Sequence, residues 1–253
     1  MKICVLSSGS KGNCTYVETK NHKILIDIGT SSLYVEKSLE KIGINPEDID
    51  IVLITHSHID HVKGLKVFCK KYSPEVYISD IILGEANLNN FNFNLLSSLD
   101  FISDINITEL NLSHDVKEIK GYIIEEVSKS MVYITDTGYI QEKYFEILKN
   151  KSVYVFESNH DIEMLMNNPN YPHSTKIRIL SDKGHLSNKD SSYYLSKFIG
   201  ESTKYIVLAH LSEQNNTESL VLNTLNSVLN SKNINIPNLI IARQNELTEV
   251  LNI

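Results

Sequence analysis

The amino-acid sequence predicts an α+β fold in which mixed β-sheets are covered by helices. Short segments with strand character fill the first 26 residues, and later strands alternate with segments of helical periodicity. This order of elements is typical of folds in which helices pack on the outer faces of layered sheets. The 253 residues contain no internal repeat and no linker-like segment, so we expect residues 1–253 to form a single domain.

Hydrophobic periodicity predicts where the elements lie. Runs of alternating or continuous apolar residues predict strands at residues 2–7, 14–19, 23–26, 51–54, 76–79, 105–112, 121–127, 131–135, 152–156, 205–209 and 239–241. Apolar residues at helical spacing predict helices over residues 35–42, 62–72, 141–148 and 217–228. Ser187 is the expected N-cap of a further helix. The Asn-rich segment from Ile81 to Asp100 predicts a short helix and a loop, and the polar segment from Ser158 to Ser174 is assigned neither helix nor strand.

Composition narrows the classes of protein. The formal net charge of −7 argues against a protein whose whole surface coats nucleic acid, but not against an enzyme that holds phosphates locally. No stretch approaches the roughly 20 apolar residues of a membrane-spanning helix, and the apolar run at the start is too short for a signal peptide. Three cysteines without CxxC spacing suit a reducing compartment. We therefore expect a cytoplasmic protein without a membrane partner.

The segment THSHIDH, from Thr55 to His61, is the strongest functional signal. Three histidines and an aspartate lie within six residues, between an apolar run and an amphipathic run. This pattern predicts a polar loop between a buried strand and a helix. His56 and His58 can turn toward one metal ion, while Asp60 and His61 face a second position beside it. Imidazole and carboxylate ligands together suit Zn, Fe or Mn.

Candidate ligands recur at the ends of three later strands. His114, Asp136 and His210 each follow a predicted strand, and residues at strand ends gather along one edge of layered α/β folds. Taken alone, each of these three residues could also have a purely structural role. A single histidine at a strand end is more often a hydrogen-bonded structural residue, and an aspartate before Thr-Gly is often a turn residue. Together with the histidine cluster, the three supply enough ligands for a two-metal centre.

These residues resemble the ligand pattern of the metallo-β-lactamase fold superfamily, whose HxHxDH signature matches residues 56–61. The resemblance covers nearly the whole chain, in order, and implies an αββα sandwich of two mixed sheets with helices on both outer faces. It implies one metal position formed by His56, His58 and His114, a second formed by Asp60, His61 and His210, and Asp136 as the bridge between them. Asp27 resembles the aspartate that orients the metal loop without binding metal.

Four further segments resemble the YycJ/WalJ-type branch of this superfamily, which is associated with 5′-to-3′ exonuclease action on DNA. They are residues 8–14 (SGSKGNC), 157–161 (ESNHD), 181–188 (SDKGHLSN) and 209–213 (AHLSE). The resemblance implies a nuclease with a nucleic acid substrate and two divalent metal ions. Two such ions about 3.5–4 Å apart can hold a bridging hydroxide that attacks a phosphodiester.

Asp60, His185 and Glu157 are the predicted catalytic residues. Cleavage needs a proton for the leaving oxygen, and His185 precedes a capped helix whose N-terminus favours anions, so His185 is the candidate donor or phosphate clamp. Glu157 can pair with His185 and hold it protonated. Alternatively, His185 is a histidine at the start of a helix that has no catalytic role. His160, close to Glu157, is a candidate for a residue that supports the ligands from behind.

Several basic and polar residues are candidates for contacts with substrate. Lys11 lies in a Gly/Ser loop, and Lys176 and Arg178 lie between the two predicted catalytic segments, where they can line a groove for a nucleic acid backbone. Such charges are also common on solvated surfaces. Asn188, in a segment that resembles the exonuclease branch, is the fourth candidate.

Two other classes of function remain open. A thioester, lactone or β-lactam hydrolase can use the same two-metal centre, because a fold does not fix a function. Asp136 argues against a classical β-lactamase, since those relatives commonly place cysteine in the second metal position. A non-enzymatic regulator that keeps the metals is the other alternative. The interval between Asp136 and His185 is too short for the extra domain of β-CASP nucleases, so any lid must come from residues 158–174.

Overall fold

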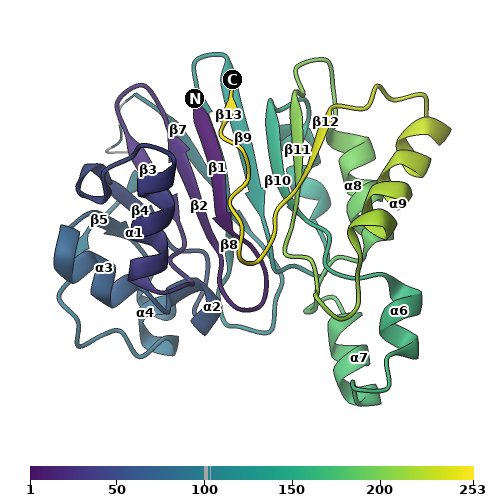
Figure 1. Cartoon of the computed structure of the whole chain (residues 1–253), viewed down its shortest axis with the longest axis horizontal. Coiled ribbons are helices and arrows are strands. Elements are labelled where there is room, and N and C mark those ends of the chain that lie inside the picture. The colour runs from purple at the N-terminus through teal and green to yellow at the C-terminus, as the bar shows by residue number, and fades with distance from the viewer. Residues whose placement is uncertain (100–101, 103) are drawn as a thin grey trace.

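The computed structural model describes residues 1–99, 102 and 104–253. Two β-sheets pack face to face, and helices cover the outer face of each (Figure 1). This is the αββα arrangement of two mixed sheets that the sequence predicts, so the α+β fold class is confirmed. Within the described part of the chain, no helix has the length and apolar character needed to cross a membrane.

The first sheet has the strand order β13-β1-β2-β3-β4-β5-β6. Its strands are β1 (Lys2–Ser7), β2 (Cys14–Glu18), β3 (Lys23–Ile26), β4 (Ile51–Leu53), β5 (Glu75–Tyr77), β6 (Asn94–Leu95) and β13 (Leu251–Asn252). Strands β1, β2 and β3 pair antiparallel, whereas β3, β4 and β5 run parallel. The carboxyl ends of β3 and β4 therefore lie at the same edge of the sheet.

The second sheet has the order β12-β11-β10-β9-β8-β7. Its strands are β7 (Asn106–Asn111), β8 (Lys120–Glu126), β9 (Lys129–Ile134), β10 (Val153–Glu157), β11 (Tyr205–Ala209) and β12 (Asn238–Ile241). Strands β9 to β12 are parallel, and β8 is antiparallel to both β7 and β9. Strand β7 therefore points the same way as β9, β10 and β11, and all four end at one edge.

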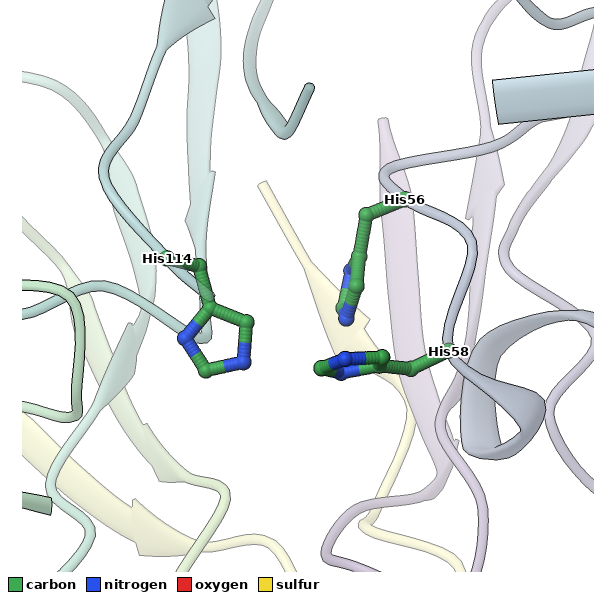
Figure 2. A group of neighbouring side chains, drawn as sticks. All are labelled: His56, His58 and His114. Carbon is green, nitrogen blue, oxygen red and sulfur yellow. The ribbon is translucent and has the colours of Figure 1, made fainter. Parts of the chain in front are cut away.

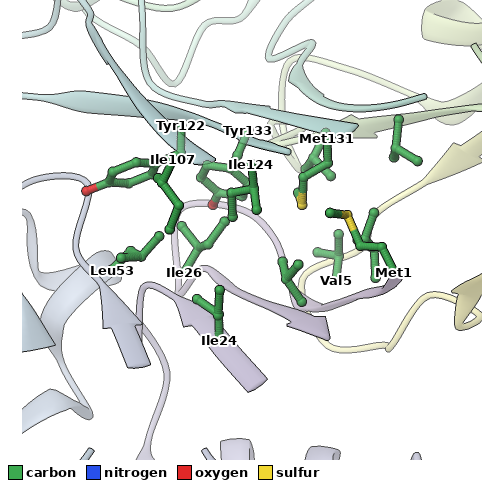
Figure 3. Packing of buried hydrophobic residues seen from close by; sticks show 14 of the residues in the cluster. Met1, Val5, Ile24, Ile26, Leu53, Ile107, Tyr122, Ile124, Met131 and Tyr133 are labelled. Carbon is green, nitrogen blue, oxygen red and sulfur yellow. The ribbon is translucent and has the colours of Figure 1, made fainter. Parts of the chain in front are cut away.

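An apolar core fills the space between the two sheets (Figure 3). Ile26 and Leu53 enter it from the first sheet, Tyr122 and Tyr133 enter it from the second, and each is at most 2 % exposed. The buried hydroxyl of Tyr122 donates a hydrogen bond of 2.7 Å to the carbonyl oxygen of Ile54. Because Ile54 precedes the histidine cluster, this bond ties the second sheet to the start of the candidate site.

Each sheet has a second apolar layer under its own helices. Helices α1 (Ser32–Lys41), α3 (Leu65–Tyr72) and α4 (Asp80–Glu85) cover the first sheet, and α5 (Phe145–Leu148), α8 (Asn188–Phe198) and α9 (Glu218–Ser231) cover the second. The side chains of Ser187 and Thr217 cap α8 and α9 as predicted. Two short 3₁₀ turns, Pro46–Asp48 and Glu142–Tyr144, complete these layers.

The predicted helix over residues 62–72 is divided in two. Helix α2 (Ile59–Val62) ends before Gly64, and α3 begins after it. The amide of Gly64 donates to the carbonyl oxygen of Ile28 at 2.8 Å, and a Cβ on Gly64 would lie 2.3 Å from the carbonyl oxygen of Thr30. This close approach of two backbones separates the helices. Because α2 starts at Ile59, Asp60 and His61 lie on a helical turn and not in the loop that the sequence predicts.

Several elements were missed by the sequence patterns. Helix α6 (Ile162–Asn167) lies within the polar segment from Ser158 to Ser174, and α7 (His173–Ile179) begins at its end. They lack an apolar stripe, since Leu165 is the one buried residue of α6 and α7 buries none. The short strands β6 and β13 were also missed. The segment from Ile81 does contain the expected short helix, α4, whereas its last residue, Asp100, lies outside the described residues.

Three backbone segments meet at Gly29, directly behind the histidine cluster. The amide of Asn13 donates to the carbonyl oxygen of Asp60, and the amide of Gly29 donates to that of Asn13, both at 2.8 Å. The amide of Ile28 also donates to the carbonyl oxygen of His61 at 2.9 Å. A Cβ on Gly29 would lie 1.5 Å from the carbonyl oxygen of Asp60, so only glycine permits this crossing.

We predict that Gly29→Ala lowers the free energy of unfolding by about 2 kcal/mol or more, because the added methyl forces the Asp60 backbone away. The same displacement should reduce the amount of metal that the purified protein retains. Urea denaturation and elemental analysis measure the two effects. Gly84→Ala is the control, because its Cβ would meet only the end of the Asn89 side chain, at 3.9 Å. Equal stability of the two variants would contradict this account of the crossing.

Candidate metal centre

The seven predicted metal ligands come together at one end of the two sheets. Each follows the carboxyl end of a strand, directly or after a short loop: β4 leads to His56, His58, Asp60 and His61, β7 to His114, β9 to Asp136, and β11 to His210. The parallel alignment of these strands within each sheet explains why residues so distant in sequence meet. The geometry agrees with the general placement of sites at the carboxyl ends of parallel strands.

Three histidines form the first candidate metal position (Figure 2). His56 and His58 reach it from the loop after β4, and His114 reaches it from the second sheet. Their ring centroids lie 4.7 Å (His56–His58), 5.1 Å (His58–His114) and 5.5 Å (His56–His114) apart. One nitrogen from each ring lies within 4.8 Å of the others, which is a spacing that a single metal ion can span.

Asp60, His61 and His210 form a second group with the same spacing. Asp136 contacts this second group, because its carboxylate oxygens are 3.2 Å from His61 Nε2 and 3.3 Å from His210 Nε2. It also reaches the first group, because one ligand atom from each of His56, His61 and Asp136 lies within 4.8 Å of the others. The arrangement therefore places Asp136 where a bridging ligand would stand, as the resemblance implies.

Buried polar atoms without partners show that these residues fit a metal. His56 Nε2, Asp136 Oδ2 and His210 Nε2 are buried and have no hydrogen-bond partner among the described residues. Buried polar atoms normally have a hydrogen-bond partner, and those without one are found mainly where an ion or a water molecule binds. Here the atoms without a partner belong to candidate ligands of both groups. Imidazole nitrogens and carboxylate oxygens are also the donor set that divalent transition metals prefer.

Hydrogen bonds from behind fix which ring nitrogen faces the centre. Asp27, which is fully buried, binds His61 Nδ1 at 2.7 Å and accepts 2.8 Å bonds from both the amide and the hydroxyl of Thr55. His114 Nδ1 lies 3.0 Å from the carbonyl oxygen of Gly184. In both rings Nε2 is left to face the centre, as is usual for histidine ligands with an orienting acceptor. The predicted orienting position of Asp27 agrees with this geometry.

Three residues of the centre have left-handed backbone conformations. Asp27, Asp136 and His210 have φ angles of 61°, 57° and 55°, and each lies just beyond the end of its strand. Non-glycine residues in this region are uncommon and carry a conformational cost. The amide of His210 is anchored by the hydroxyl oxygen of Ser8 at 2.8 Å. The chain therefore turns sharply at each of these positions, which points the side chains inward.

Burial and charge divide the histidines into two classes. Burial lowers the pKa of His56 far below its usual value, and burial also lowers the pKa of His114. Both rings are neutral and ready to bind metal at neutral pH. Burial opposes charge on His61 as well, but the carboxylates of Asp27 and Asp136 outweigh it and raise the pKa of His61 well above its usual value.

His210 shows the same balance. Its burial favours the neutral ring, yet Asp136, Asp60 and Glu157 together raise its pKa to about 10. In return, His210 and His61 hold the pKa of the buried Asp136 well below its usual range. Without metal, the second group therefore keeps protons on the nitrogens that would bind the ion.

His185, which is partly exposed, and Glu157, which is fully buried, form a pair beside these ligands. His185 Nδ1 lies 2.7 Å from Glu157 Oε1 and 3.7 Å from Asp136 Oδ1. Glu157 Oε2 accepts hydrogen bonds from the amides of Thr137 and Leu186, at 2.9 and 3.2 Å. Despite complete burial, the neighbouring imidazoles of His185 and His210 hold the pKa of Glu157 at about 2. The imidazole of His185 lies parallel to that of a ligand, with its centroid 5.4 Å from that of His210.

The structure places three of the four residues predicted to contact substrate on the surface and buries the fourth, Asn188. Lys11, Lys176 and Arg178 are on the surface, where they pair with Glu213 at 2.5 Å, with the carbonyl oxygen of Met166 at 2.6 Å and with Asp115 at 2.6 Å, respectively. Their contact with substrate stays a prediction.

Asn188 corrects the sequence prediction. Its side chain is buried, and it exchanges hydrogen bonds of 2.8 Å with Asn216 and accepts one of 3.1 Å from Ser158. It therefore holds loops together behind the site and does not face a substrate. His160 is also buried. Neither ring nitrogen has a hydrogen-bond partner in the described structure, and burial lowers its pKa to about 4. Its supporting role stays a prediction.

Two residues at the centre escaped the sequence patterns. Asp115 Oδ1 lies 3.4 Å from His58 Nε2 and 3.2 Å from His114 Nε2. Asn13 Nδ2 lies 3.0 Å from His61 Nε2. The position of Asp115 directly after His114 was the available signal. For Asn13 the available signals were its turn chemistry and its place in the segment 8–14, which resembles the exonuclease branch, but only the fold brings this loop to α2.

The fold and this ligand set define the class of protein as a metal-dependent hydrolase. The family model described as the metallo-beta-lactamase superfamily matches residues 8–124. Exodeoxyribonuclease YycJ of Bacillus anthracis is 36% identical over 243 residues, which cover 93% of this chain and 92% of that protein. Exodeoxyribonuclease WalJ of Streptococcus pneumoniae serotype 2 is 36% identical over 233 residues, which cover 88% and 86%.

The chain therefore belongs to the metallo-β-lactamase superfamily and, within it, to the branch that contains YycJ and WalJ. The fold is shared more widely. The metallo-beta-lactamase fold protein YhfI from Bacillus subtilis superposes with a TM-score of 0.71, over 98% of each chain, at 16% identity.

We predict that metal binding at neutral pH releases roughly two protons per protein, because His61 and His210 must lose the protons that their raised pKa values retain. Metal affinity should therefore rise with pH. Calorimetric titrations in two buffers of different ionisation enthalpy measure the protons released. His22→Gln, which changes a histidine bound to Asp104 outside the centre, should leave the number unchanged. Binding without proton release would contradict the protonation of the second group.

Proposed function

We propose that the protein is a two-metal phosphodiesterase that degrades DNA as an exonuclease with 5′-to-3′ polarity. The observation that carries this proposal is the His185–Glu157 pair, which sets a proton donor next to the ligand cluster. Phosphodiester cleavage needs such a donor for the leaving oxygen. The printed names of the two relatives, both exodeoxyribonucleases, support DNA as the substrate class.

His185 is placed to deliver a proton at the open side of the centre. Its side chain is 19 % exposed, and Glu157 occupies its Nδ1. No described residue hydrogen-bonds its Nε2, which therefore faces the space that a substrate would enter. Glu157 accepts hydrogen bonds from two amides and binds His185 Nδ1, so it fixes the orientation of the imidazole. Asp136 Oδ1 lies 3.7 Å from the same nitrogen.

We propose two divalent ions, Zn, Mn or Fe, at the two groups. Such ions polarise a phosphoryl oxygen and lower the pKa of water. His56, His58 and His114 would hold the first and Asp60, His61 and His210 the second, with Asp136 shared. Asp60 is the ligand nearest to solvent in the second group, with a side chain that is 17 % exposed, and it is therefore the predicted catalytic carboxylate.

No observation favours the alternative functions. A regulator without activity would not need a proton donor aligned with a complete ligand set. A thioester hydrolase expels a thiolate, which is a better leaving group than an alkoxide, and so has less need for the His185–Glu157 pair. We further propose that residues 1–253 act as one domain, since the central core draws on strands from both halves of the chain. A cytoplasmic location, as the sequence analysis expects, agrees with a DNA substrate.

A test of exonuclease action compares linear DNA that carries 5′-phosphates with covalently closed circular DNA of the same sequence. We expect degradation of the linear form and resistance of the circle, measured by gel electrophoresis with each metal added in turn. Cleavage of both forms at equal rates would exclude exonuclease action. Turnover of a thioester or a β-lactam without DNA cleavage would overturn the phosphodiesterase proposal as well.

His185→Ala should slow phosphodiester cleavage by roughly 10²–10⁴, the usual contribution of a general acid, while both metals are retained. Single-turnover kinetics and elemental analysis measure the two properties. His173→Ala, which changes an exposed histidine at the start of α7, serves as the control and should retain normal cleavage. Loss of metal from the His185 variant would make His185 a ligand instead of a proton donor.

A further inference from the structure

A pocket of 390 Å³ opens beside the three-histidine group, and its wall includes His114. The loop between β7 and β8 contributes Lys117 to this wall, and the turn before His185 contributes Lys183. Ile81 of α4, whose side chain is 49 % exposed, also lines it. The pocket thus combines a candidate metal ligand, two cations and an apolar surface.

The two lysines are presented by backbone that is held in place. The amide of Lys117 donates to both carboxylate oxygens of Glu85, at 3.2 and 3.3 Å. Lys183 precedes Gly184, whose carbonyl oxygen binds His114 Nδ1. A Cβ on Gly184 would lie 2.0 Å from the carbonyl oxygen of Ile179, so this turn is packed against the end of α7.

The ammonium groups of Lys117 and Lys183 form no ion pair with any described residue, in contrast to two other cations near the centre. Arg178 is neutralised by Asp115, and Lys11 is neutralised by Glu213. Glu118, the acidic residue of the pocket wall, is itself bound by Lys120 at 3.0 Å. In a chain of net charge −7, an unneutralised pair of lysines next to a metal ligand is a local site for an anion.

We propose that this pocket is a subsite for a backbone phosphate of the nucleic acid strand, next to the phosphodiester that is cleaved. The inference rests on the proposed function, which supplies the strand. Lys117 and Lys183 contact the phosphate, and the exposed side chain of Ile81 packs against the adjoining sugar or base. An apolar wall distinguishes a nucleotide from free phosphate, which has no apolar part.

The test is the double variant Lys117→Gln/Lys183→Gln, compared with Lys20→Gln/Lys204→Gln. The control removes the same charge from two exposed lysines, one in the β2–β3 turn and one before β11, at the strand ends opposite the centre. Binding of a fluorescent, 5′-phosphorylated single-stranded oligonucleotide is measured by anisotropy at several salt concentrations, with inorganic phosphate as competitor. Steady-state KM and kcat are measured in parallel.

We expect the pocket variant to raise Kd and KM by about 10-fold with kcat and metal content close to normal, and to reduce the salt slope of binding by about 0.7 for each lost phosphate contact. The control variant should behave like the original protein. Equal effects of the two variants, or displacement of the oligonucleotide by millimolar phosphate, would overturn the subsite. Wild-type protein that binds the oligonucleotide through these lysines but cleaves no DNA would instead overturn the proposed function alone.

Discussion

The buried carboxylate of Asp27 is the interaction on which the centre depends. It receives the amide and hydroxyl of Thr55 and the Nδ1 of His61, so one side chain fixes both ends of the segment that carries four ligands. Burial raises the pKa of Asp27, and only these partners make its charge tolerable in the interior. A carboxylate in this position without them would cost several kcal/mol. The loop and the aspartate therefore require each other, and the left-handed backbone at Asp27 is the conformation that brings them into contact.

The balance of charges at the centre explains how a protein of net negative charge can bind a polyanion. Four carboxylates, those of Asp60, Asp115, Asp136 and Glu157, lie at the centre, and protons on the imidazoles of His61 and His210 offset part of their charge in the absence of metal. Divalent ions would replace those protons and reverse the local sign of the potential, which the count of side chains does not reveal. The overall charge of −7 then limits non-specific adhesion to nucleic acid, so attraction is confined to the centre and its nearest cations.

The sequence predicted the layers, most strands and the histidines and aspartates that meet at one end of the sheets, because each depends on short-range patterns: period-two strands, capped helices and polar residues just after a strand. It failed where only tertiary contact decides. Helices α6 and α7 bury almost nothing and so have no periodicity to read, and the break at Gly64 reflects a backbone that passes close by. Asn188 belonged to the right segment, but its side chain faces Asn216 and not the site. Asp115 and Asn13 reach the histidines only because distant loops fold onto them.

The turn from Ser181 to His185 joins the candidate metal group to the proposed substrate contacts. Its Gly184 carbonyl binds the candidate ligand His114, while the residues on either side of Gly184 are Lys183, which lines the pocket, and His185, the proposed proton donor. The space behind Gly184 admits no side chain, so the turn has one position relative to the metal group. A displacement of this turn would disturb ligand orientation, phosphate contact and proton delivery together. The first sheet therefore carries the histidine loop after β4, and the second sheet carries His114, Asp136 and His210 together with the proposed donor pair of His185 and Glu157.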